Sequence, residues 1–91
     1  MSFDWDEEKA RINLAKYGIS FDETASVFEN TLFLAFADPA HSLQEQRFIM
    51  MGESTRKRLL VVAYTERAGN TRLISARLAT RKERKAYESN L

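Results

Sequence analysis

The sequence has no cysteine, and its 91 residues include only one histidine, one proline and three glycines. The lack of cysteine excludes disulfide bonds, thiolate nucleophiles and zinc–cysteine sites. The single histidine, His41, cannot supply a histidine-rich metal site, and the scattered glycines form no phosphate-binding loop. No apolar run approaches the roughly 20 residues that cross a bilayer, and the acidic N-terminus has no signal-peptide core. We therefore expect one soluble, cytoplasmic domain over residues 1–91.

The net charge of +1 hides an uneven distribution of charge along the chain. Residues 1–45 carry three basic and nine acidic side chains, a net charge of −6, whereas residues 46–91 carry eleven basic and four acidic ones, a net charge of +7. This difference predicts a basic surface that meets nucleic acid or an acidic partner. Attraction between the two halves within the fold is the alternative explanation.

Helical spacing and capping residues predict a first helix that begins at Asp4 or Asp6 and continues through Lys16. Gly18 is suited to end it, because glycine readily adopts a positive φ. Its apolar spacing is given by Ala10, Leu14 and Tyr17, or by Ile12 with Ala15. Asn13, in the middle of this helix, is either exposed or hydrogen-bonded.

The rest of the chain predicts an α+β fold. A second short helix is expected to begin at Ser20 and to end near Glu29. Four strands follow, over residues 31–36, 46–51, 57–65 and 71–77, and a last helix spans about 81–90. Short turns between successive strands imply an antiparallel sheet, and the third strand, apolar on both faces, is expected at its centre. A short N-terminal strand near Trp5 is also possible in this arrangement.

The stretch from Thr71 to Tyr87 combines a strand and a helix with a dense group of cations. Thr80 and Glu83 form a capping box at the start of the helix. We expect a polyanion such as RNA, or an acidic partner, to be bound by the basic side chains of this stretch: Arg72, Arg81, Lys82, Arg84 and Lys85. On a regular strand Arg72 and Arg77 point to opposite faces unless a bulge intervenes, and Leu73 and Ser75 share the face of Arg77.

Two functions are consistent with this cationic corner. Guanidinium groups bind phosphates and stabilise the charge of a phosphoryl transition state, so a ribonuclease without histidine is chemically possible. The alternative is a non-enzymatic basic module that binds nucleic acid or an acidic partner protein without cleaving it. For any single arginine, a solvated surface charge remains the simpler explanation.

Several motifs along the chain resemble those of the BrnT toxins, the Brucella ribonuclease toxin family. The first is the pattern W-D-x-x-K-x-x-x-N-x-x-K-x-G-I-x-F from Trp5 to Phe21. The last is R-x-I-S-A-R-x-A-T-x-x-E-R-x-x-Y from Arg72 to Tyr87. Between them lie Arg47-Phe48 with Gly52, and Tyr64-Thr65-x-Arg67. One departure is Tyr17, at a position where the family usually has histidine.

The resemblance implies a RelE-like fold and a toxin of a type II toxin–antitoxin system that cuts RNA and inhibits translation. It also implies a BrnA-like antitoxin with a ribbon-helix-helix fold. The complex would bind operator DNA only through this antitoxin. It implies no metal, no cofactor and no membrane partner. By the family's pattern, the catalytic residues would be Arg67, Arg77, Lys16, Arg47 and Tyr87.

Overall fold

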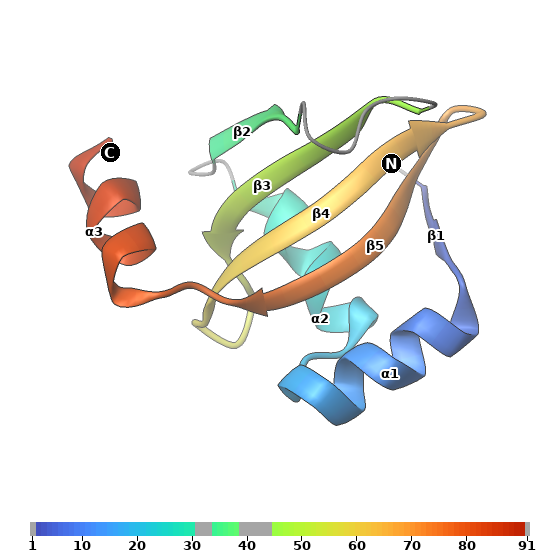
Figure 1. The fold of residues 1–91 in the computed structure, drawn as a ribbon, viewed down its shortest axis with the longest axis horizontal. Helices are drawn as coiled ribbons and strands as arrows, with labels where there is room; N and C mark the ends of the chain where they lie inside the picture. Colours follow the sequence, from blue (N-terminus) through green and yellow to red (C-terminus); the bar gives the residue numbers. More distant parts are fainter. Residues whose placement is uncertain (1, 31–33, 39–44, 91) are drawn as a thin grey trace.

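The computed structural model describes residues 2–30, 34–38 and 45–90 of the chain. Its elements, shown in Figure 1, are β1 (Phe3–Trp5), α1 (Glu7–Tyr17), α2 (Phe21–Ser26), η1 (Val27–Glu29), β2 (Leu34–Ala37), β3 (Arg47–Glu53), β4 (Leu59–Arg67), β5 (Asn70–Leu78) and α3 (Arg81–Ser89). The predicted α+β class and order of elements are confirmed. The start of the predicted strand at 31–36 and the loop around His41 lie outside the described residues. No described helix is long and apolar enough to cross a membrane.

The sheet has five strands in the order β1-β5-β4-β3-β2. Strands β2 to β5 form the predicted antiparallel arrangement, with β4 at the centre. The N-terminal strand β1 adds a fifth member and pairs with β5 in parallel, so the whole sheet is mixed. Only residues 71–73 of β5 pair with β1, and the second half of β5 is therefore bordered by α1 instead.

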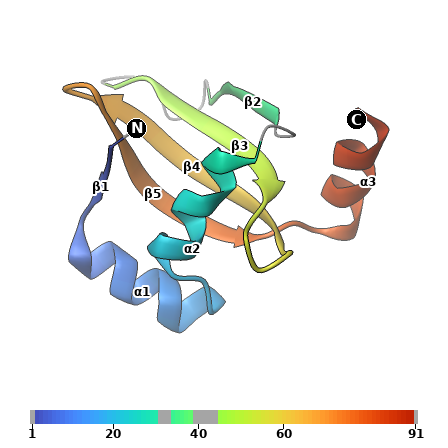
Figure 2. The same ribbon diagram turned by 180° about the vertical axis from the view of Figure 1, so that it is seen from behind.

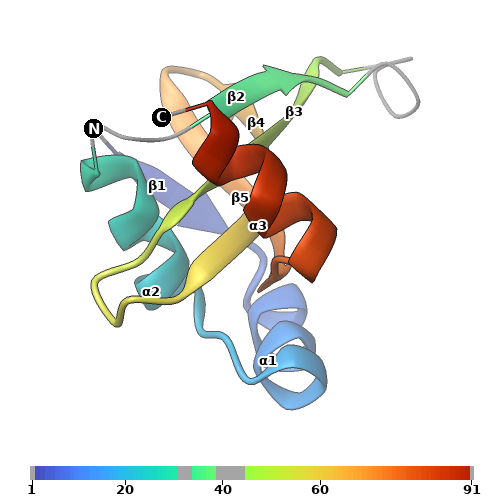
Figure 3. The same cartoon turned by 90° about the vertical axis from the view of Figure 1, so that its left-hand side faces the viewer.

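Two apolar clusters cover the two faces of the sheet. One contains Phe21 and Val27 from the α2 side together with Leu60 and Val62 of β4. The other lies under α3, where Tyr87 packs with Met51, Leu59 and Val61. Figure 2 shows α1 and α2 on one side of the sheet, and Figure 3 shows α3 standing at the end of the sheet. The α3 face is thus covered by a described helix at one end only.

Helix α1 is capped by Asp6, and the alternative start at Asp4 is wrong. The Asp6 carboxylate accepts hydrogen bonds from the amides of Glu8 and Lys9, at 2.8 and 3.2 Å. Asp4 instead lies in β1. Gly18 ends the helix with φ of 70°, as predicted.

The predicted apolar face of α1 is largely wrong. Leu14 is 53% exposed and Ile12 is 48% exposed, and of the expected residues only Ala10 packs against the core. The buried residue is Asn13, whose Nδ2 donates to the carbonyls of Ile19 and Ala76 at 3.0 and 2.9 Å. Its Oδ1 accepts from the Ala76 amide at 3.1 Å. Asn13 therefore joins α1 to β5 through backbone groups that β1 does not reach.

A register irregularity in β5 changes which side chains share a face. Tyr64 pairs with Leu73 and Ala63 pairs with Ser75, so Ile74 has no partner on β4. The extra residue makes Leu73 and Ala76 both face the α1–α2 side, where both are buried. The expectation that Leu73 shares the face of Arg77 is therefore wrong.

Candidate functional site

Four arginines lie on the sheet face that carries α3. Arg47 on β3 and Arg72 on β5 are both paired with Thr65 on β4, and so form one row across three strands. Arg77 pairs with Val61, and Arg67 stands at the end of β4 opposite Asn70. Side chains of directly paired residues point to the same face of a sheet, and so do the side chains of every second residue along β4. Because of the extra residue in β5, Arg72 and Arg77 share this face.

Arg67, Arg72 and Arg77 are paired with carboxylates of described residues. Arg67 makes a two-pronged contact with Glu45 at 2.8–3.1 Å, and both side chains are substantially exposed. Arg72 lies 3.3 Å from Asp4 of β1. Exposed ion pairs of this kind are worth at most about 1 kcal/mol, since water screens both partners. A phosphate group could therefore replace these carboxylates at little cost.

The third pair, Arg77 with Glu83, is built into the corner between β5 and α3. Arg77 Nη1 and Nη2 donate to the two Glu83 oxygens at 2.8 and 2.9 Å. Glu83 also accepts from the Thr80 amide at 2.9 Å, while Thr80 Oγ1 accepts from the Glu83 amide at 3.1 Å. The predicted capping box is thus confirmed, and it also fixes the carboxylate that orients Arg77.

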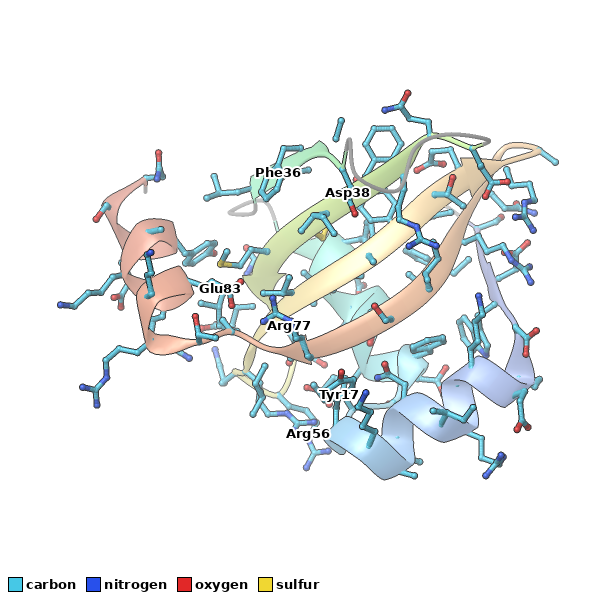
Figure 4. The ribbon with its side chains drawn as sticks, viewed as in Figure 1. Tyr17, Phe36, Asp38, Arg56, Arg77 and Glu83 are labelled. Atoms are coloured by element: carbon cyan, nitrogen blue, oxygen red, sulfur yellow. The ribbon has the colours of Figure 1, made fainter. Side chains whose placement is uncertain are left out.

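The contact between Arg77 and Glu83 shifts the pKa values of both side chains. Hydrogen bonds from Arg77 lower the pKa of Glu83 from 4.5 to about 2. Glu83 therefore stays ionised at neutral pH and is a poor proton acceptor. The pKa of Arg77 is raised, first by its hydrogen bonds to Glu83 and to a smaller extent by electrostatic interaction with Tyr17. Figure 4 shows Tyr17 in the space between α1 and β5, close to Arg77.

The remaining predicted catalytic residues lie on either side of this corner. Tyr87 is buried in the cluster with Val61, the residue opposite Arg77, and burial raises the pKa of its phenol. The phenol is therefore protonated at neutral pH. Lys16 lies in the last turn of α1, with Nζ 5.2 Å from the centre of the Tyr17 ring.

The predicted RNA-binding residues fall into two sets. Arg72 belongs to the sheet face described above. The others are exposed in the first half of α3: Arg81, Lys82, Arg84 and Lys85. They extend the positive surface outward from the Arg77 corner, and helix α3 carries Glu83 as its one acid in the first turn.

The fold thus gathers the predicted residues into two groups. Arg47, Arg67 and Arg72 lie toward the hairpin that joins β4 to β5, and Arg77 and Tyr87 lie toward α3. Sequence analysis missed Glu83 as the partner of Arg77, although the capping box had marked its position. No group of three or more histidine, cysteine, aspartate or glutamate side chains that could hold a metal ion occurs among the described residues.

Comparison with known proteins gives a family match and a structural match. Residues 5–83 match the family model described as ribonuclease toxin, BrnT, of type II toxin–antitoxin system. The fold is similar to the crystal structure of the Brucella abortus ribonuclease toxin BrnT, with a TM-score of 0.65 and 24% sequence identity. That match covers 89% of this chain and 99% of the other. No curated protein sequence matches the chain.

Proposed function

The chain belongs to the BrnT family of ribonuclease toxins of type II toxin–antitoxin systems, and we propose that it is an endoribonuclease that needs no metal ion. The observation that carries this proposal is the gathering of arginines from three strands on one partly open face, next to the Arg77 corner. Several fixed cations can supply the charge neutralisation that a metal ion gives in other nucleases. By cutting RNA the protein would inhibit translation, and it would act in the cytoplasm.

Arg77 is our candidate for the group that contacts the scissile phosphate. Negative charge builds up on the phosphate oxygens as the phosphodiester bond breaks, and a planar guanidinium can donate two hydrogen bonds to them. Glu83 holds that guanidinium in one orientation before RNA arrives, so Glu83 is a positioning residue. Arg47, Arg67 and Arg72 would hold phosphates farther along the strand.

Proton transfer is assigned to Tyr87 and Lys16. The Tyr87 phenol carries its proton at neutral pH, since the ordinary pKa of tyrosine is about 10 and burial raises that of Tyr87, and it would donate this proton to the leaving 5′-oxygen as the phosphodiester bond breaks. The attacking 2′-hydroxyl of the RNA gives up its proton to water as its bond to phosphorus forms, and Lys16, in the last turn of α1, would assist this transfer. Arg81, Lys82, Arg84 and Lys85 would attract the RNA backbone without reading its sequence.

The antitoxin is proposed to be a BrnA-like ribbon-helix-helix protein, through which the complex would reach operator DNA. The family assignment implies an antitoxin partner. An acidic segment of such a protein could occupy the arginine face as Glu45 and Asp4 do. Such a segment would neutralise the toxin because the RNA phosphates could then no longer contact these arginines.

The test is RNA cleavage by purified protein in excess EDTA. We expect wild-type protein to cleave RNA, Arg77→Ala to lose activity by at least a hundredfold, and Arg77→Lys to remain impaired because lysine cannot donate in the same two-pronged way. Arg11→Ala is the matched control, since Arg11 is also paired with a glutamate on the surface but lies in α1. Full activity in a folded Arg77→Ala protein would remove Arg77 from the mechanism.

The non-enzymatic alternative gives a different result in the same experiment. A basic binding module would leave RNA intact and would release it steeply as salt increases. Cleavage that requires added Mg²⁺ would contradict metal independence and leave ribonuclease activity in place.

A further inference from the structure

A hollow of about 210 Å³ lies between α1 and the second half of β5. The hollow exists because β1 ends at Trp5, opposite Leu73, and leaves the following residues of β5 beside the helix. Asn13 bridges the two walls with its hydrogen bonds to Ala76. The side chains around it are Lys9, Ile12, Asn13, Lys16, Tyr17, Ile74 and Ser75.

The charge of this hollow distinguishes it from other hollows on the surface. Lys9 and Lys16 lie on its α1 wall, and no acidic side chain is among the described residues that line it. The charged residues of the hollow along α2 are Asp22 and Glu29, and those of the hollow beside the β3–β4 turn are Glu29, Glu53 and Lys57. Of these three hollows, the α1–β5 hollow is therefore the one whose lining carries a net positive charge and attracts a polyanion.

Tyr17 places an aromatic ring at the edge of the hollow nearest the Arg77 corner. Its side chain is 39% exposed although it is large and partly apolar. Lys16 Nζ lies over its ring, 5.2 Å from the ring centre, and Figure 4 shows Tyr17 beside Arg77. Lys16 is therefore placed to hold a phosphate next to a base that stacks on this ring.

The geometry points to a nucleotide subsite in this hollow, in which an unpaired RNA base stacks on Tyr17 while Lys9 and Lys16 hold its flanking phosphates. Ile12 and Ile74 give the base an apolar surface, and the Ser75 hydroxyl can bond its edge. This inference rests on the proposed function, because it extends the RNA path from Arg77 over the edge of β5. It also identifies the substrate as single-stranded, since a base within a duplex cannot reach such a ring.

The test measures binding separately from cleavage. The probe is a short fluorescent 2′-O-methyl RNA of mixed sequence, which lacks the free 2′-hydroxyl, and affinity is measured by anisotropy. We expect Tyr17→Ala to weaken binding about tenfold, the loss expected when one base–aromatic stack is removed. Tyr17→Phe should bind like wild type, because the ring is retained. Leu14→Ala is the matched control, since Leu14 is an exposed apolar residue of α1 outside this hollow.

A second probe that lacks bases decides whether the contact is stacking. With this abasic probe, wild type and Tyr17→Ala should bind equally, whereas Lys9→Ala should weaken binding to both probes and reduce the salt dependence. Equal binding of the normal probe by wild type and Tyr17→Ala would overturn the inference, as would no binding by wild type. Tyr17-dependent binding without any cleavage of natural RNA would leave the subsite in place and refute the ribonuclease proposal alone.

Discussion

Substitution of Asn13 directly tests how the fold is stabilised, because this one side chain joins α1 to β5. It is 5% exposed, and it makes three hydrogen bonds with the buried backbone of Ala76 and Ile19, at 2.9–3.1 Å. Each such bond contributes about 1 kcal/mol net, and a buried amide or carbonyl left without a partner costs about 1–3 kcal/mol. Alanine is the better helix former by roughly 0.6 kcal/mol, which offsets part of the loss.

We therefore expect Asn13→Ala to lower the free energy of unfolding by about 3 kcal/mol, a large part of the 5–15 kcal/mol typical of a domain. Urea titration followed by Trp5 fluorescence measures this change. Trp5 is the single tryptophan, and it packs edge-to-face against buried Phe21 at 5.8 Å, so its emission reports loss of the core. The midpoint should fall while the slope with urea stays constant.

The matched control is Asn90→Ala. Asn90 Nδ2 also donates to a backbone carbonyl, that of Ala86 at 2.8 Å, but the contact is exposed at the end of α3. Its loss should change stability by no more than about 0.5 kcal/mol. If Asn13→Ala cost less than about 1 kcal/mol, or no more than the Asn90 variant, water would be replacing the three bonds and the reasoning above would be refuted.

Two further predictions concern charge and backbone conformation. Because the pKa of Glu83 is about 2 in the native state, below its unfolded value, its contact with Arg77 stabilises the fold above about pH 4.5 and is lost as the pH falls toward 2. Glu83→Gln should therefore cost about 1 kcal/mol at pH 7, after allowance for the 41% exposure of Arg77, and nothing near pH 2, as measured by urea unfolding across pH. Ala68 in the β4–β5 hairpin has φ of 53°, so Ala68→Asn should raise the melting temperature by stabilising the turn by about 0.5–1 kcal/mol. An unchanged or lower melting temperature would contradict this account of the turn.

The sequence predicted the elements whose signals are local. The central position of β4 followed from its apolar run, and the Thr80–Glu83 capping box marked the start of α3. Ser20 and Glu23 have the spacing of a capping box at the start of α2, but this box is formed only in part. Ser20 Oγ accepts from the Glu23 amide at 3.0 Å, but the Glu23 carboxylate turns to Arg58 and to Ser54, at 2.9 and 2.7 Å.

What the sequence could not supply are contacts between distant segments. The Glu23 carboxylate accepts a hydrogen bond from Arg58, 35 residues away, and the Asn13 side chain accepts one from the Ala76 amide, 63 residues away. Helical spacing on α1 favoured Leu14 and Tyr17 as inward residues, because an apolar pattern carries no information about an uncovered strand edge. The irregularity at Ile74 leaves no mark in the sequence either, yet it determines that Arg72 and Arg77 share a face.

The carboxylates on the arginine face give a physical reason why this surface can bind RNA and still be stable without it. A bare row of arginines would repel itself, and Asp4 and Glu45 relieve that repulsion through pairs that water keeps weak. A phosphate that replaces either one therefore displaces less than about 1 kcal/mol of existing contact. Glu83 differs, because the capping box holds it in place and its low pKa shows a stronger interaction with Arg77. RNA should thus displace Asp4 and Glu45 but bind beside Glu83, which leaves Arg77 oriented when the phosphate arrives.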